Sequence, residues 1–157
     1  MHKLPACLLS SLALLLAQAS LASAQNVPRD VPPAPGSPPA YRQVVTAKPG
    51  TMVWVSGQIA QNEKGELIGR GDVKAQADQV WENVRRALAA GGATFKDVVK
   101  VTTYVVNYQP SMRDDLRAAR LRAMGTDTPP PAATLVGVQS LASADWLIEI
   151  EAVAVIP

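Results

Sequence analysis

Cysteine and histidine are nearly absent from this sequence. Its 157 residues include one of each, Cys7 and His2. One cysteine excludes an internal disulfide, and the two residues together are too few for an ordinary zinc site. A cysteine nucleophile or a Ser-His-Asp triad would depend on one of these two positions near the N-terminus.

Runs of one charge are also absent. The sequence carries 15 Lys and Arg against 13 Asp and Glu, for a net charge of +2. Proteins that bind nucleic acid usually gather basic residues on one face, so we predict no nucleic-acid partner. With 48% hydrophobic and 18% charged residues, the composition is that of a globular protein, and the length suits one domain.

Residues 1–24 show the order of features found in a secretory signal peptide. A positive start that includes Lys3 precedes a Leu- and Ala-rich stretch at 7–16, and Ala22-Ser23-Ala24 forms a cleavage signal. The apolar stretch is about half of the ~20 residues that a membrane-spanning helix needs, so cleavage is favoured over anchoring. We predict a periplasmic or secreted protein with no stable membrane association.

Cleavage at this site would remove both Cys7 and His2, and removing 24 of the 157 residues would leave 133. The chemistry of the remaining chain would depend on carboxylates, hydroxyls, Lys, Arg, Tyr and backbone amides. We therefore predict neither a metal site nor a cofactor. Residues 25–40 contain six prolines, which favour an extended linker, so the domain is predicted to span 41–157.

The first half of this domain is predicted to hold two strands and a helix. Residues 41–47 and 51–59 are rich in Val, Trp and Tyr around Pro49-Gly50, which favours a hairpin. Apolar residues in 72–91 recur with the period of a helix. Asp72 is a suitable N-cap, and Gly91-Gly92 can end the helix.

The second half is predicted to hold three strands and a second helix. Residues 100–106 favour a strand, and Ser111-x-x-Asp114 predicts a capping box that starts a helix ending near Met124. Residues 132–138 and 146–156 favour two more strands. The predicted order β-β-α-β-α-β-β is typical of an α+β sandwich, in which two helices cover one face of a mixed sheet.

The last strand is apolar on both of its faces, apart from Glu149 and Glu151 on one of them. A two-layer monomer would leave one sheet face in water, so the pattern indicates burial against other chains. Carboxylates are costly to bury without partners. We expect these two to line an interface cleft or to pair with bases.

Three segments together resemble one protein family: VSGQIAQNEKGELI at 55–68, AQADQVWENVRRALAAGGATFKDVVKVTTYVV at 75–106, and IEIEAVAV at 148–155. They are similar to the Rid family of reactive-intermediate deaminases, also known as L-PSP endoribonucleases. The resemblance implies a chorismate-mutase-like homotrimer, whose sheets form a barrel with small-molecule clefts between subunits. It also implies hydrolysis of an imine or enamine, such as 2-iminopropanoate, to a keto acid and ammonia.

The resemblance carries over to some of the family's site residues. Tyr41, Ser56 and Gly57 match residues that line the family's cleft, and Glu149 matches the residue that positions the attacking water. Each also has a structural interpretation. Glu149 could pair with a base at an interface, Tyr41 could only pack, and Ser56-Gly57 could be a turn. Trp54, Trp81 and Trp146 are predicted to be core or interface residues.

The sequence departs from the family at the catalytic arginine. Ala133 stands in that position, followed by Thr134 in the same part of the predicted substrate-binding cleft, and Leu116 replaces a helix asparagine. Alanine cannot grip a carboxylate as a guanidinium does, so we expect weak activity on 2-iminopropanoate. Arg42 is the nearby cation considered as a replacement, but strand alternation turns it away from Tyr41.

Two function classes therefore remain open. The first is a secreted hydrolase that acts on a small imine, enamine or related carbonyl compound. The second is a trimer that binds a small metabolite without catalysis. The ribonuclease activity implied by the family's second name is not favoured, because the chain left after the predicted cleavage has no histidine and no basic stripe.

Overall fold

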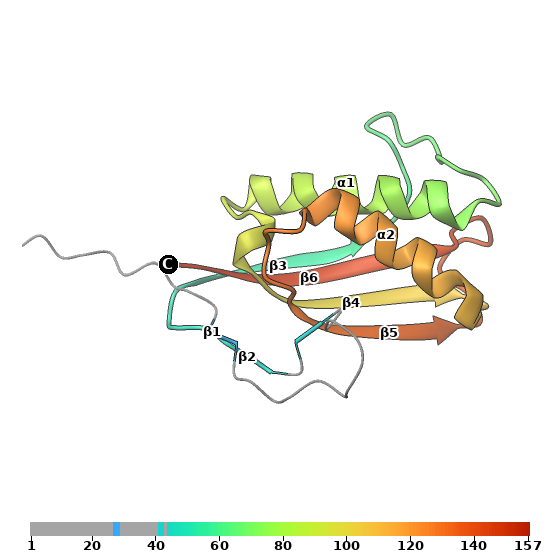
Figure 1. Ribbon diagram of the computed structural model, residues 1–157. Helices are drawn as coiled ribbons and strands as arrows, with labels where there is room; N and C mark the ends of the chain where they lie inside the picture. The colour runs from blue at the N-terminus through green and yellow to red at the C-terminus, as the bar shows by residue number, and fades with distance from the viewer. Residues whose placement is uncertain (1–26, 29–40, 43) are drawn as a thin grey trace, which may run out of the picture.

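A computed structural model describes residues 27–28, 41–42 and 44–157 (Figure 1). The predicted signal peptide at 1–24 and all of the predicted linker except Val27–Pro28 lie outside these residues. The described elements, in chain order, are β1 (Val27–Pro28), β2 (Val45–Thr46), β3 (Thr51–Gln58), α1 (Val73–Ala90), β4 (Val98–Val106), α2 (Arg113–Met124), β5 (Ala132–Val138) and β6 (Ile148–Ile156). Short 3-10 turns at Phe95–Asp97 and Pro110–Met112 precede β4 and α2.

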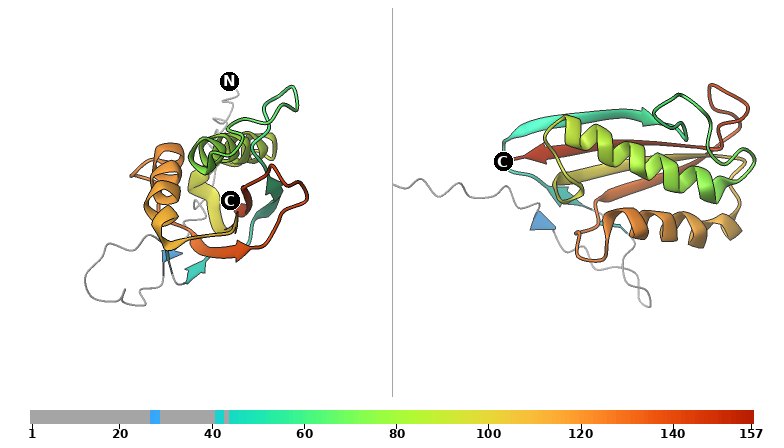
Figure 2. Two further views of the ribbon diagram at one scale, coloured as in Figure 1. Left: turned by 90° about the vertical axis from the view of Figure 1, so that its right-hand side faces the viewer. Right: turned by 90° about the horizontal axis from the view of Figure 1, so that it is seen from above.

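The main sheet has four strands in the order β3-β6-β4-β5. Strand β6 is antiparallel to both of its neighbours, whereas β4 and β5 are parallel. Both helices lie on one face of this sheet (Figure 2). This arrangement confirms the predicted α+β sandwich with two layers. No helix among the described residues is long and apolar enough to span a bilayer.

The predicted hairpin is wrong. Strand β3 pairs with β6, while β2 pairs with β1. Upstream, the backbone N–H of Arg42 donates to the carbonyl of Pro131 at 3.0 Å, and Arg42 bridges Ala132 at the start of β5. At Arg42 the chain therefore lies beside the start of β5, at the opposite edge of the sheet from β3, and the turn at Pro49-Gly50 does not close a hairpin.

Helix α1 begins and ends where the sequence predicts. The carboxylate of Asp72 accepts hydrogen bonds from the backbone of Lys74 and Ala75 at 2.9 and 3.2 Å, and Gly91 ends the helix. The capping box at Ser111 is wrong, because Pro110 starts a 3-10 turn that already includes Ser111. Helix α2 instead follows Met112, without a side-chain cap.

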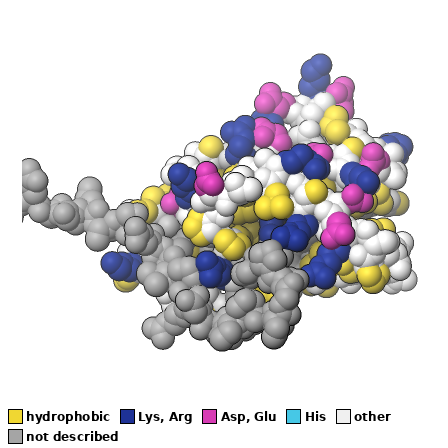
Figure 3. Space-filling view, in the orientation of Figure 1, with side chains coloured by type: hydrophobic (Ala, Val, Ile, Leu, Met, Phe, Trp, Pro, Cys, Tyr) yellow, Lys and Arg dark blue, Asp and Glu magenta, His cyan; other side chains and the backbone are white. Residues whose placement is uncertain are grey.

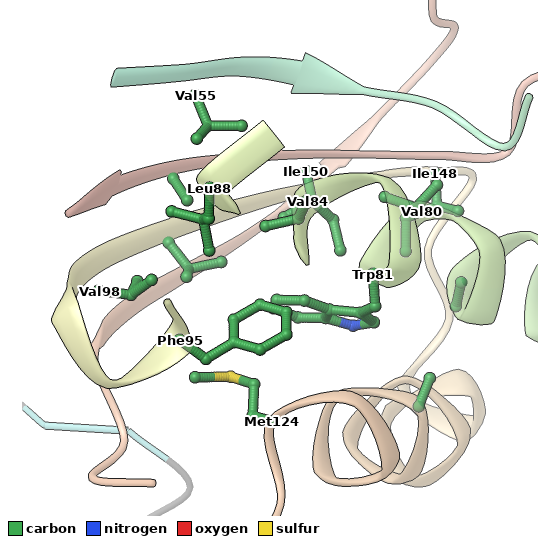
Figure 4. Close-up of a cluster of buried hydrophobic side chains, with 14 of the residues drawn as sticks. Val55, Val80, Trp81, Val84, Leu88, Phe95, Val98, Met124, Ile148 and Ile150 are labelled. Atoms are coloured by element: carbon green, nitrogen blue, oxygen red, sulfur yellow. The ribbon is translucent and has the colours of Figure 1, made fainter. Parts of the chain in front are cut away.

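The core lies between the helices and the sheet (Figure 4). Trp81 of α1 meets Phe95 edge to face, with ring centroids 5.9 Å apart, a favourable geometry for aromatic pairs. The core-facing side of β6 contributes Ile148 and Ile150, both fully buried. Trp81 is buried as predicted, whereas Trp54 is 71% exposed.

The other face of the sheet carries Trp54 and remains uncovered in the single chain. Trp54 is opposite Val153 of β6, and Met52, two residues earlier on β3, is also exposed. On the same face Lys100 donates a hydrogen bond to Thr134 across β4 and β5. Apolar side chains at the β3 end thus adjoin polar ones at the β5 end.

Candidate functional site

Gly57 and Glu149 meet at an irregularity between β3 and β6. Three steps along β3, from Val55 to Gln58, match two steps along β6, from Ala152 to Ile150. Such a bulge re-aims the backbone and often adjoins functional sites. Here it brings Gly57 so close to Glu149 that a Cβ on Gly57 would lie 1.7 Å from Glu149 Oε1. Only glycine leaves this carboxylate in its present place.

The carboxylate of Glu149 accepts no hydrogen bond from any described residue. Its neighbour on the same strand face, Glu151, accepts one from the hydroxyl of Tyr104 at 3.2 Å. Desolvation first, and then the bond to Glu151, raise the pKa of Tyr104, so this hydroxyl keeps its proton. Of the two carboxylates, Glu149 is therefore the one whose acceptor sites are open to a water or a ligand.

A polar hollow of about 420 Å³ lies on the α1 side of Gly57. Its polar groups are already used within the fold. Asn83 donates to the carbonyls of Ile59 and Gln61 at 2.8 and 2.7 Å, and Arg86 pairs with Glu63 at 2.9 Å. These contacts fix the chain that follows β3 and thereby support the bulge.

A second cavity, of about 380 Å³, lies between α2 and the sheet. Three of the predicted site residues line it: Tyr41, Ala133 and Thr134. Leu116, which the sequence resemblance matches to a helix asparagine, forms part of its wall. The structure therefore brings Tyr41, Leu116 and Ala133 together at one cavity.

The predicted site residues form two separate groups in this chain. Ala133 pairs with Val101, and Val101 with Ala152, all on the helix-covered face of the sheet. Glu149 alternates to the opposite face, and Ser56 and Gly57 lie on the edge strand farthest from β5. One chain does not bring Glu149 and Ala133 into a single site.

The cavity also contains three arginines that the sequence analysis missed. Arg113, Arg117 and Arg120 of α2 line it together with Ala133. The expectation that Arg42 is the nearby cation is thus incomplete. The spacing i, i+4 and i+7 places the three on one helix face, and this signal was present in the sequence. Figure 3, viewed from the α2 side, shows basic side chains across this face with acidic ones between them.

The charges on the α1 side of α2 are paired. Arg122 meets Asp78 at 2.7 Å, and Asp115 meets Lys74 at 3.0 Å. The cavity arginines form no ion pair with any described residue. Burial lowers the pKa of Arg120, and the nearby charge of Arg117 lowers it further. The cavity therefore presents positive charge that the described residues do not neutralise.

Metal ligands do not gather anywhere in the described part of the chain. There, no group of three His, Cys, Asp or Glu side chains could hold a metal ion. The chemistry available at the site residues includes the Glu149 carboxylate, the hydroxyls of Tyr41, Ser56 and Thr134, and the α2 guanidinium groups.

The chain is similar to proteins of one family along most of its length. The family model described as Endoribonuclease L-PSP matches residues 32–156. A RutC family protein of Pyrococcus horikoshii is 35% identical over 130 residues, which cover 83% of this chain and 92% of the relative. A 2-iminobutanoate/2-iminopropanoate deaminase of Dermatophagoides farinae is 32% identical, over 74% of this chain and 85% of the relative.

Solved structures agree with this result. The crystal structure of a Rid family protein of unknown function from Yersinia pestis superimposes with a TM-score of 0.73 and 37% identity. It covers 82% of this chain and 98% of its own. The likeness therefore includes nearly the whole described domain, with both groups of site residues.

Proposed function

Because the chain belongs to the Endoribonuclease L-PSP family, which includes the RutC and Rid proteins, we propose that it is a hydrolase that deaminates a small imine or enamine. The observation that carries this proposal is the Glu149 carboxylate, which lies against Gly57 with its acceptor sites open. A relative named as a deaminase supports the same reaction type.

The proposed reaction needs one water and one proton shuttle. Glu149 accepts a proton from the water while the water oxygen bonds to the imine carbon, and the proton passes to the nitrogen. Glu149 then takes the hydroxyl proton of this carbinolamine and passes it to the nitrogen as the C–N bond breaks, so ammonia leaves and a carbonyl compound remains. An enamine enters the same sequence after it tautomerises to the imine. No cofactor takes part.

We place this reaction in a cleft between subunits of a homotrimer. The site residues support this placement, because one chain keeps Glu149 and Gly57 apart from Tyr41 and Ala133. A neighbouring copy could join the two groups across the sheet edges. The exposed Met52 and Trp54 offer the apolar surface that such an interface needs.

The alternative is a trimer that binds a small metabolite without catalysis, and Ala133 is the observation that favours it. In the proposed enzyme, 2-iminopropanoate is expected to be a weak substrate, because its carboxylate adjoins the imine carbon and Ala133 offers it no charge. Ammonia release from a series of small imines, some with and some without a carboxylate, tests the proposal. Rates equal to the uncatalysed background for every imine would favour the binding protein.

Replacing Trp54 with Glu is expected to break the trimer. The indole is 71% exposed in the single chain, and a carboxylate at a buried interface position would have to be desolvated without a partner. Light scattering coupled to size-exclusion chromatography should report a trimer for the wild type and a monomer for the variant. A monomeric wild type at micromolar concentration would contradict the proposed assembly.

Export is proposed from the N-terminal pattern of residues 1–24. Protein purified from the periplasm or the medium of an expressing bacterium is expected to begin at Gln25, because the Ala-Ser-Ala motif immediately precedes it. N-terminal sequencing checks this result. A cytosolic protein that still begins at Met1 would contradict it.

A further inference from the structure

We propose that Arg117 and Arg120 of α2, with Arg113 beside them, form an anion site that takes the carboxylate of the ligand. This inference rests on the proposed function, which locates the reacting imine in the cleft between subunits. It adds the class of ligand that this cleft binds. The ligand is a small organic carboxylate whose charged group reaches the helix wall of the cavity, not the strand wall at Ala133.

The first argument is the position of the three side chains. They line the 380 Å³ cavity that also contains Ala133, and their spacing along α2 directs them to one helix face. Leu116, Ile148 and Ile150 supply apolar walls to the same cavity. Apolar walls with a few convergent charged groups are typical of small-molecule sites.

The second argument is charge. Arg122, two residues from Arg120, has an acidic partner in Asp78, but the cavity arginines have none among the described residues. Arg120 is partly buried and lies close to the charge of Arg117, and both effects lower its pKa. A carboxylate bound between the two guanidinium groups would relieve this repulsion and accept charge-assisted hydrogen bonds.

The third argument concerns ligand size. A guanidinium on β5 would hold a carboxylate against the sheet, whereas the α2 guanidinium groups approach from the facing wall of the cavity. A carboxylate held there lies away from Ala133. The site therefore favours ligands in which one or more carbons separate the charged group from the reacting carbon, and it disfavours 2-iminopropanoate.

Calorimetric titration tests the site. The protein, in the assembly that it forms in solution, is titrated with glutarate and, separately, with glutaramide, an uncharged probe of the same length. Glutarate is expected to bind at least about tenfold more tightly than glutaramide, because only the carboxylates accept charge-assisted hydrogen bonds from the guanidinium groups. The double variant Arg117→Gln/Arg120→Gln should weaken glutarate binding at least about tenfold. Arg122→Gln, on the paired side of α2, should leave it unchanged.

Thermal unfolding of each variant shows whether a loss of glutarate binding comes from a loss of folding. The variant Arg120→Lys keeps the positive charge and should retain part of the affinity for glutarate. Equal binding of the two probes, or unchanged glutarate binding in the double variant, would overturn the anion site. Ammonia release from an uncharged imine is measured on the same preparations. Glutarate binding without any ammonia release would uphold the anion site and reject the deaminase, and ammonia release without glutarate binding would do the reverse.

Discussion

Replacing Glu149 with Gln should lower the rate of imine hydrolysis by about 100-fold to 10,000-fold, the usual contribution of a general base. An amide oxygen is a poor acceptor for the proton of an attacking water, while the size and shape of the side chain hardly change. Steady-state ammonia release gives kcat and KM. The loss is expected in kcat, because the missing proton acceptor acts on the chemical step.

Glu151→Gln is the matched control for this experiment. Glu151 lies on the same strand and the same sheet face, but it is already engaged by the hydroxyl of Tyr104. Its replacement is expected to change kcat by less than about tenfold, because the amide oxygen of Gln can still accept the hydrogen bond from Tyr104 and Glu151 takes no part in the proposed proton transfer. If both substitutions reduced kcat equally, the face as a whole would matter and Glu149 would have no special role.

Local sequence patterns predicted the elements of this fold better than their pairing. The apolar period along 72–91 and the cap at Asp72 define α1 without any distant information. The strand that pairs with β3 could not be predicted from such local patterns. Residues 45–46 and 148–156 both favour strands, and only the full sheet shows that the chain around Arg42 runs along the opposite edge, beside Pro131.

The candidate site shows the same limit. The family's motifs predict Gly57 and Glu149 as site residues, and the structure shows a physical reason for the glycine, which is the close approach of the carboxylate. The motifs do not identify Arg117 and Arg120. Arginines spaced along a helix are usually solvated, and Arg117 is itself exposed. What sets Arg117 and Arg120 apart is that they line one cavity together with Ala133 of β5.

Gly57→Ala is expected to reduce kcat by about 100-fold while leaving the fold intact. The added Cβ would lie 1.7 Å from Glu149 Oε1 and 2.6 Å from Cδ, so the carboxylate must move by more than about 1 Å to restore ordinary contact. A misplacement of that size can cost about 100-fold in rate. The atoms that move belong to the end of a flexible side chain, and Gly57 has no positive φ, so thermal stability should change little.

A double-mutant cycle with Glu149→Gln decides whether Gly57 acts through this carboxylate. If the Gly57→Ala substitution acts by displacing the Glu149 side chain, then the double variant should be about as slow as Glu149→Gln alone, because the proton acceptor is already lost. Independent effects would instead multiply, which adds about 2.7 kcal/mol to the barrier for a further 100-fold loss. A multiplicative result would show that Gly57 contacts the substrate or shapes the cleft by itself, and the close approach to Glu149 would then be structural.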